Sequence, residues 1–328
     1  MKIVHILAAR PNFIKAAPVI EALHTHENII IHTNQHYDFE MSKIFFRDLD
    51  IPEPDYHLGI QSGTHGEQTG KGIIEIEKVL IKINPKRVIV YGDVNSTLAG
   101  AIAAVKLNIP IYHIEAGCRS SDWTMPEEVN RILVDSISSK LFCTEKSAYD
   151  NIKSDKAYHV GNTAIDTLHK IQNRLQPVIP GYYLSTLHRP FNVDFPDRLN
   201  SILNKLNKLD KPVIIPTHPR LNKYLVNKSM YDNIKFIQPL GYIEFISYIK
   251  HCDGVITDSG GVQCEAAFFK KPTLTLRNST EHIITLSHGN KLGDIEDIIP
   301  FNFKNIILMD TPFEWDGRAS KRIAEIIK

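Results

Sequence analysis

Short apolar runs alternate with longer stretches of helical periodicity along the first half of this 328-residue sequence. The helix-like stretches lie at about 13–25, 38–47, 65–83, 95–107 and 126–139. The runs typical of strands lie at 2–8, 28–33, 87–91, 109–114 and 140–143. Strands that are apolar throughout, separated by helices, are typical of a parallel sheet covered on both faces. The first half is therefore predicted to be an α/β domain.

The alternation stops and restarts near the middle of the chain. A helix is predicted at 163–175, and residues 176–181, which include two prolines, are interpreted as a domain boundary. Beyond it, strands are predicted at 182–187, 212–216, 234–237, 254–257, 272–276 and 305–308, and helices at about 196–208, 242–251, 260–269 and 317–328. The length suits two domains of about 150 residues each. We expect the α/β class, with two Rossmann-like doubly wound domains, 1–175 and 176–328, facing a cleft. The last helix is able to pack back on the first domain.

The charge balance argues against two classes of partner. Lys and Arg number 38 and Asp and Glu number 37, so the formal net charge is +1. Such a chain has no global field to attract nucleic acid or an anionic membrane. No apolar run approaches the roughly 20 residues of a membrane span. Any affinity for phosphate is expected to be local.

The cysteines and the start of the chain indicate the compartment. Cys118, Cys143, Cys252 and Cys264 show no C-x-x-C spacing, which favours reduced thiols over a disulfide or zinc framework. The sequence starts on a strand-like segment without a signal peptide ahead of it. We expect a soluble, cytoplasmic protein without a metal site. Neither half carries a G-x-G-x-x-G or P-loop pattern, so no dinucleotide site is indicated and no cofactor is expected.

The segment around Ser259 combines a strand end, a tight turn and a helix start. An apolar run ends at Asp258 and Ser259, and Gly260 and Gly261 open a helical pattern. Unobstructed backbone N–H groups at the positive end of a helix form a seat for phosphate. Glu265, one turn further on, would repel phosphate and is better suited to sugar hydroxyls such as those of ribose. In the alternative interpretation, Asp258 and Ser259 only cap the helix and the glycines only turn the chain.

Carboxylates are predicted to meet at one edge of the first sheet. Asp93 and Glu115 each follow a predicted strand, and ligands bind outside the carboxyl ends of parallel strands. Glu127 and Arg131 are four residues apart on one face of a helix that Pro126 opens. Crowded acids have their proton affinities pushed apart, so one site can hold both a general acid and a general base. The alternative is that Asp93 caps a helix and Glu127 pairs with Arg131.

Cations are predicted at the ends of other strands. Arg10 and Lys15 follow the first strand, although both could be solvated surface residues. In the second half, His188 and Arg189 follow one strand and His218 follows the next. Each histidine alone would more often be structural, but His-Arg pairs at adjacent strand ends suit a diphosphate. Arg277, Thr280 and Glu281 follow the strand predicted at 272–276 and are expected at the same edge of the second sheet.

Acids on one wall of a cleft and phosphate-binding groups on the other suit a nucleotide-diphosphate sugar. The second domain would hold the diphosphate and the nucleoside, and the first domain would act on the sugar.

The order and spacing of these motifs resemble the non-hydrolysing UDP-N-acetylglucosamine 2-epimerases over nearly the whole chain. The matching positions are Ala9-Arg10-Pro11 with Lys15 and Pro18, Gln35-His36, Glu67-Gln68-Thr69, Gly92-Asp93, residues 113–117, Pro126-Glu127-Glu128 with Asn130-Arg131, Gly161-Asn162-Thr163, His188-Arg189, residues 257–263 and Thr280-Glu281. Each piece alone is a weak signal, and the series is a strong one. The resemblance implies the two-domain type B glycosyltransferase fold and a homodimer.

The resemblance also implies a reaction, the inversion of C2 in UDP-GlcNAc to give UDP-ManNAc without a nicotinamide. UDP is eliminated as a base takes the C2 proton, and it is added back after the opposite face is protonated. The implied acid/base residues are Asp93, Glu115 and Glu127, assisted by Arg131 and His188. The implied UDP contacts are Arg10, Lys15, Arg189, Ser259, Gly260, Gly261 and Glu265. Family members can also bind a second, activating UDP-GlcNAc in a region that Gln35, His36 and Gln68 match.

Several positions depart from the family pattern. They are Ala8-Ala9 for Gly-Thr, Asn34 for Gly, Pro190-Phe191-Asn192 where many members have a glutamate, Cys264 for a glutamate and His282-Ile283 for Arg-Pro. These changes leave the acids intact and alter the sugar surroundings, so a UDP-diacetamido-hexose or its uronic acid is an alternative substrate. Three alternative functions are a hydrolysing 2-epimerase that releases UDP and a free ManNAc-type sugar, a glycosyltransferase of the same fold, and an inactive sugar-nucleotide binder.

Overall fold

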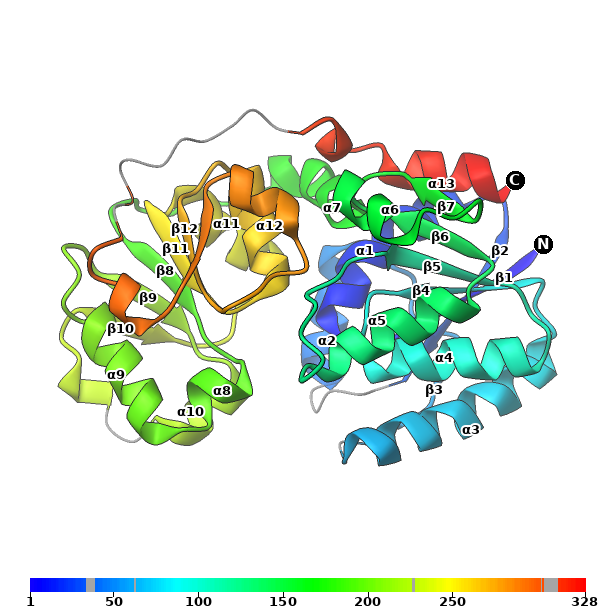
Figure 1. Ribbon diagram of the computed structural model, residues 1–328, viewed down its shortest axis with the longest axis horizontal. Coiled ribbons are helices and arrows are strands. Elements are labelled where there is room, and N and C mark those ends of the chain that lie inside the picture. The colour runs from blue at the N-terminus through cyan, green and yellow to red at the C-terminus, as the bar shows by residue number, and fades with distance from the viewer. Residues whose placement is uncertain (34–38, 62, 226–227, 302, 304–311) are drawn as a thin grey trace. The chain divides into compact units, whose positions relative to one another are not determined.

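The computed structural model describes residues 1–33, 39–61, 63–225, 228–301, 303 and 312–328. The chain divides into two compact units (Figure 1). Unit 1 comprises Met1–Ile171 and Pro312–Lys328, and unit 2 comprises Gln172–Thr311. Within the described ranges, no helix is both long and apolar enough to cross a membrane.

Unit 1 is built on a seven-stranded parallel sheet in the order β3-β2-β1-β4-β5-β6-β7. Its strands are β1 (Lys2–Leu7), β2 (Glu27–His32), β3 (Tyr56–His57), β4 (Arg87–Tyr91), β5 (Ile111–Ala116), β6 (Lys140–Cys143) and β7 (Ala157–His159). Its helices are α1 (Arg10–Ala22), α2 (Phe39–Asp48), α3 (His65–Ile83), α4 (Asn95–Lys106), α5 (Pro126–Ile137), α6 (Lys146–Ile152), α7 (Thr163–Ile171) and α13 (Ala319–Ile327). The strand order reverses between β1 and β4, and such a switch point is where doubly wound sheets bind ligands.

Small residues allow the helices of unit 1 to pack closely. A Cβ atom built on Gly100 of α4 would lie 3.0 Å from Ile6 of β1. A Cβ atom built on Gly72 of α3 would lie 2.9 Å from the Cβ of Ala99. The two glycines therefore let α4 lie against the sheet and α3 lie against α4. This packing fixes the start of α4, directly after the turn that carries Asp93.

Unit 2 is built on a six-stranded parallel sheet in the order β10-β9-β8-β11-β12-β13. Its strands are β8 (Tyr183–Thr186), β9 (Val213–Pro216), β10 (Ile234–Ile237), β11 (Gly254–Thr257), β12 (Thr273–Leu276) and β13 (Asn290–Gly293). Its helices include α8 (Pro190–Val193), α9 (Pro196–Leu206), α10 (Pro219–Tyr224), α11 (Tyr242–His251) and α12 (Gly260–Phe268). Here the order reverses between β8 and β11.

The C-terminal helix α13 belongs to unit 1, where Asp166 of α7 holds its first residues. The Asp166 carboxylate accepts hydrogen bonds from the backbone N–H of Ala319 (3.2 Å), the backbone N–H of Ser320 (2.7 Å) and the Ser320 hydroxyl (2.7 Å). Burial raises the pKa of Asp166, and these bonds offset part of that rise.

The expected α/β class with two doubly wound units is confirmed, and the differences concern single elements. The sequence pattern misses β3, α6, β7, α8, α10 and β13, which are short and offer little periodicity. The helix expected at 163–175 ends at Ile171 and continues as a 3₁₀ turn, Gln172–Arg174. The strand expected at 109–114 is β5, Ile111–Ala116, so Glu115 lies inside the strand. The strand expected at 305–308 lies outside the described residues.

Candidate active site

Two residues with left-handed backbone lie at the carboxyl ends of β4 and β5. Gly92 follows β4 with a φ of 62°, and Glu115 has a φ of 72°. The pairing of β5 with β6 shifts between Ile114 and Ala116, so Glu115 is the inserted residue of a β-bulge. This conformation costs a residue other than glycine about 1–2 kcal/mol. Backbone outliers that the fold maintains cluster at functional sites, which makes Glu115 a candidate on structural grounds.

A buried ion pair joins α1 to this bulge. Lys15 Nζ lies 2.6 Å from Glu115 Oε1, and only 13% and 7% of the two side chains are exposed. Burial alone would lower the pKa of Lys15, but the carboxylates of Glu115 and Asp93 raise it overall. Lys15 therefore remains a cation between two acids. The contact with a diphosphate that the resemblance implies for Lys15 stays a prediction, and the structure places its ammonium on Glu115.

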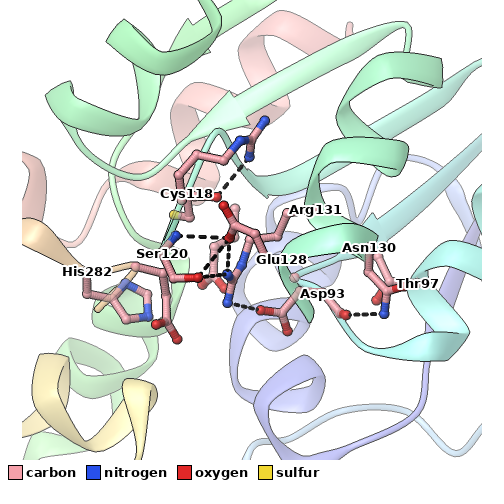
Figure 2. Close-up of polar contacts among 12 residues, drawn as sticks. Asp93, Thr97, Cys118, Ser120, Glu128, Asn130, Arg131 and His282 are labelled. Carbon is pink, nitrogen blue, oxygen red and sulfur yellow. Dashed lines mark hydrogen bonds and ion pairs between the residues drawn. The ribbon is translucent and has the colours of Figure 1, made fainter. Parts of the chain in front are cut away.

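Arg131 of α5 connects two carboxylates in unit 1 (Figure 2). Its Nη2 lies 2.6 Å from Asp93 Oδ2, and its Nη1 lies 2.6 Å from Glu128 Oε2. The adjacent Asn130 donates from its side chain to the backbone carbonyl of Asp93, at 2.8 Å. Two consecutive residues of α5 thus hold both the side chain and the main chain of Asp93. The sequence suggests a pairing of Arg131 with Glu127, and the structure shows ion pairs of Arg131 with Asp93 and Glu128.

Glu128 is a buried residue that the sequence reasoning did not single out. Its carboxylate accepts from the backbone N–H of Ser120 (2.9 Å) and Ser121 (3.1 Å) and from the Ser120 hydroxyl (3.0 Å). Burial alone would raise the pKa of Glu128, but these bonds and Arg131 lower it overall. Glu128 therefore anchors the loop after β5 to α5. Glu127 beside it is only half-buried and is the more accessible of the two.

In unit 2, Asp258 links the two strand ends at the switch point. It follows β11, is fully buried, and accepts from the backbone N–H of His188 (3.1 Å) and Arg189 (3.0 Å), which follow β8. Its Oδ1 also lies 3.0 Å from His188 Nδ1, and its Oδ2 accepts from Asn192 at 3.2 Å. Burial alone would raise the pKa of Asp258, and His188 with the other donors lowers it. In the alternative interpretation of the sequence Asp258 only caps α12, whereas the structure shows that it organises the segment that carries His188 and Arg189.

The carboxylate of Glu281 lies against Gly260 at the start of α12. A Cβ atom built on Gly260 would clash with Glu281 Oε1, so the acid packs against the glycine. Arg277, expected to bind phosphate, lies 2.7 Å from Glu281 Oε2 in a buried ion pair. Among the described residues, none lies within 4 Å of a Cβ built on Gly261. An added side-chain atom would therefore meet open space at Gly261 and the Glu281 carboxylate at Gly260.

Glu265 is buried in the first turns of α12. Burial raises its pKa from 4.5 to about 7, although the hydroxyl of Tyr242, which donates to Oε1 at 3.0 Å, acts in the opposite direction. A carboxyl group with this pKa changes its protonation state close to neutral pH. The contact of Glu265 with ribose hydroxyls stays a prediction.

The remaining predicted residues have defined surroundings. The ring of His218 lies 5.6 Å from the ring of His188, and its Nδ1 accepts from the backbone N–H of Arg220 at 3.2 Å. The guanidinium of Arg10 lies over the ring of Phe45 at 5.4 Å. Gln68 accepts from the side chain of Asn95 at 2.9 Å. Two further predicted residues lie outside the described ranges, Gln35 and His36.

A cavity of about 300 Å³ lies beside Arg277 in unit 2. Both of its arginines are engaged by acids, because Arg198 lies 2.6 Å from Asp294 and Arg277 is paired with Glu281. The cavity is therefore a poor seat for phosphate. Its other lining residues are Phe191, Phe195, Asn278 and Gly293. In the part of the chain that the structure describes, no group of three or more His, Cys, Asp and Glu residues is arranged to hold a metal ion.

The protein thus consists of two doubly wound α/β units. Unit 1 carries a cluster of acids at its switch point, and unit 2 carries a glycine turn at its own. A family model described as UDP-N-acetylglucosamine 2-epimerase matches residues 20–328. The chain therefore belongs to the UDP-N-acetylglucosamine 2-epimerase family.

Individual relatives agree with this assignment. A UDP-N-acetylglucosamine 2-epimerase homolog of Methanococcus maripaludis is 46% identical, over 92% of this chain and 93% of the relative. The UDP-2,3-diacetamido-2,3-dideoxy-D-glucuronate 2-epimerase of Pseudomonas aeruginosa is 44% identical, over 100% of this chain and 99% of the relative. The crystal structure of Methanocaldococcus jannaschii UDP-GlcNAc 2-epimerase in complex with UDP-GlcNAc and UDP is similar with a TM-score of 0.88 and 40% identity. That match covers 100% of this chain and 99% of the other.

Proposed function

We propose that this protein inverts C2 of UDP-GlcNAc, interconverting it with UDP-ManNAc without hydrolysis. The observation that carries the proposal is the buried cluster in which Lys15 and Arg131 engage the carboxylates of Glu115 and Asp93. Two carboxylates at one sheet edge, each held by a different cation, are candidates for the groups that take and return the proton. Membership of the UDP-N-acetylglucosamine 2-epimerase family supports a UDP-sugar as the substrate.

The proposed chemistry couples loss of UDP to loss of a proton. The C2 proton of the sugar is weakly acidic, so it leaves as the C1–O bond breaks and the bonding electrons depart with UDP. The product of this step is a bound 2-acetamidoglucal with a C1=C2 double bond. A carboxyl group on the opposite face then returns a proton to C2 while UDP re-forms the bond to C1. The proposed acid/base residues are Asp93, Glu115 and Glu127, assisted by Arg131 and His188.

The proposed UDP contacts lie mainly in unit 2. The open space beside Gly261 and the dipole of α12 suit a diphosphate, and Glu265 suits the ribose hydroxyls. Because Lys15 and Arg277 are engaged by carboxylates, we give them supporting roles, on Glu115 and on Glu281 respectively. The other proposed contacts are Arg10, Arg189, His218, Ser259 and Gly260.

A second candidate substrate is a UDP-2,3-diacetamido sugar or its uronic acid. The 44% identity to the Pseudomonas aeruginosa diacetamido-glucuronate epimerase favours it, because that relative is similar over the whole chain. Asn192, which departs from the sequence pattern, donates to Asp258 and to the Leu276 carbonyl, so it has a structural role here. The departure at Asn192 is therefore not evidence for a different sugar.

Product analysis tests the proposal against the hydrolysing alternative. The protein is incubated with UDP-GlcNAc, and separately with a UDP-2,3-diacetamido uronate, and the products are separated by ion-exchange chromatography. A second UDP-sugar peak without accumulation of UDP supports the epimerase. Accumulation of UDP with free sugar supports the hydrolysing reaction instead, and unchanged substrates in both incubations contradict both.

We also propose that the protein acts as a cytoplasmic homodimer. Ile74 and Ile81 lie seven residues apart on α3, so they share a helix face, and 54% and 62% of their surfaces are exposed. An exposed apolar pair of this kind is a candidate contact with a second copy. Light scattering on the purified protein, compared with the Ile74→Lys variant, measures the mass: loss of a dimer in the variant supports the contact, and a monomeric wild type contradicts it.

A further inference from the structure

His113 is a fully buried residue of β5 that the proposed chemistry does not use. Its Nε2 lies 2.8 Å from the backbone carbonyl oxygen of Gly92, and its Nδ1 lies 2.7 Å from Asp135 Oδ1. A carbonyl oxygen has no proton to donate, so Nε2 must carry one. An ionised carboxylate also only accepts, so a proton on Nδ1 is required as well if Asp135 is charged.

The surroundings of Asp135 favour its charged form. Its second oxygen accepts from the backbone N–H of Gly117 at 3.1 Å and from the guanidinium of Arg119 at 2.6 Å. Burial alone would raise the pKa of Asp135, and the charge and hydrogen bond of Arg119 are among the causes that lower it overall. Asp135 therefore accepts hydrogen bonds on both oxygens, and the proton shared with His113 belongs to the ring.

We propose that His113 is a doubly protonated imidazolium in the folded protein and acts as a positioning residue for Asp93. It would do so by holding the carbonyl of Gly92, which directly precedes Asp93. The positioning role rests on the function proposed for Asp93, whereas the protonation state of the ring does not.

The contacts of Gly92 explain how a distant side chain can position this acid. The N–H of Gly92 donates to the Ile114 carbonyl at 2.9 Å, so both of its peptide groups are bonded to β5. A Cβ atom built on Gly92 would lie 3.0 Å from Lys15 Nζ and 3.5 Å from Glu115 Oε1. A displacement of Gly92 would therefore disturb the Lys15–Glu115 pair as well as Asp93.

His5 provides an internal comparison within the same sheet. It is also fully buried, but its partners are the Tyr91 hydroxyl at 2.7 Å and Asn28 Oδ1 at 3.0 Å. A tyrosine hydroxyl can donate, so a ring with a single proton satisfies both contacts. Burial lowers the pKa of His5 to about 4, although Asn28 acts in the opposite direction. His5 is thus expected to be neutral, in contrast to His113.

Nuclear magnetic resonance of ¹⁵N-histidine-labelled protein without substrate tests the protonation state. At neutral pH, His113 should show two N–H groups on one ring and His5 should show one. The signals are assigned with His113→Gln and His5→Gln. In Asp135→Asn, His113 should retain only the N–H that faces Gly92. A single N–H on His113 in the wild-type protein overturns the inference, whatever the enzymatic activity proves to be.

Kinetics test the positioning role. His113→Phe keeps a planar ring but removes both donors, and we expect kcat for C2 exchange to fall by about 100-fold, the scale associated with misplacement of reacting groups by 1 Å. KM and the affinity for UDP should stay unchanged, and His113→Gln, which keeps one N–H donor, should recover part of kcat. Wild-type kcat in a folded His113→Phe protein overturns the role. If that variant does not fold, Asp135→Asn replaces it, with reduced kcat at unchanged UDP affinity in support and wild-type kcat against.

Discussion

The ammonium of Lys15 lies 2.6 Å from the carboxylate of Glu115, a residue 100 positions further along the chain. Both side chains are almost excluded from water, so neither charge can be hydrated if its partner is removed. Loss of one partner from a buried pair is strongly destabilising, whereas replacement of both can be close to neutral.

Replacement of Lys15 by Met should therefore lower the free energy of unfolding by about 3 kcal/mol. The double variant Lys15→Met/Glu115→Gln should recover part of that loss without recovering C2 exchange. Urea unfolding measures the free energy of unfolding of the single and the double variant. Lys146→Met is the matched control, because its pair with Asp150 is exposed, with 68% and 40% of the side chains accessible, and little or no change is expected. Equal effects of the two single variants would contradict the account of the buried pair.

Asp93→Asn and Glu115→Gln should separate chemistry from binding. Each removes a proposed acid/base group in unit 1 and leaves the proposed UDP contacts of unit 2 in place. We expect no C2 exchange, with UDP affinity within about tenfold of the wild type, or ~1.4 kcal/mol. Calorimetric titration with UDP provides the measurement, and Asp150→Asn on the exposed face of α6 is the control. Abolition of UDP binding by either variant would show that the two functions are not divided in this way.

Glu265 should make stability depend on pH. Its pKa in the folded protein is about 7, above the ordinary 4.5, so the folded state retains the proton more tightly. The resulting stabilisation is fully present below pH 4.5 and is lost as pH rises through 7, with a total change of about 3 kcal/mol. Glu265→Gln abolishes this titration. Urea unfolding at about pH 5 and about pH 8 should thus show a smaller difference in the variant than in the wild type. Equal differences would mean that Glu265 titrates normally.

The two glycines at the start of α12 should respond differently to alanine. In Gly260→Ala the added methyl group meets the Glu281 carboxylate, which Arg277 holds in place, so a loss of about 1–3 kcal/mol is expected from overpacking. Gly261→Ala places its methyl group in open space and should be neutral or slightly stabilising. Thermal unfolding compares the pair directly. Similar melting temperatures for the two variants would show that Glu281 moves aside at no cost.

Much of the fold can be predicted from the sequence, because the hydrophobic periodicity of a helix or strand is a local property of the chain. Apolar runs and helical stretches give the alternation of elements, and parallel strands place their carboxyl ends at one edge. Asp93, Glu115 and Arg131 could therefore be assigned to one site without coordinates. The bulge at Glu115 could not be predicted, because it depends on how β5 pairs with a strand that follows α5.

Which ion pairs form within the site is harder to predict from the sequence. Glu127 and Glu128 both lie one turn before Arg131, and spacings of three and four residues are equally compatible with a helical ion pair. The structure pairs Arg131 with Glu128, whose contact with Ser120 depends on the path of a loop. Lys15 and Asp258 are similar cases, because their partners, Glu115 and His188, are distant in sequence.

Incorporation of deuterium at C2 shows whether the protein removes and returns the C2 proton of a UDP-sugar. The protein is incubated in deuterated water with UDP-GlcNAc, and separately with a UDP-2,3-diacetamido sugar, and the C2 position is followed by proton NMR. We expect deuterium at C2 of intact UDP-sugars, in both the starting compound and its epimer, and none with Asp93→Asn. An absence of C2 exchange in every UDP-sugar tested would contradict the proposed C2 epimerisation.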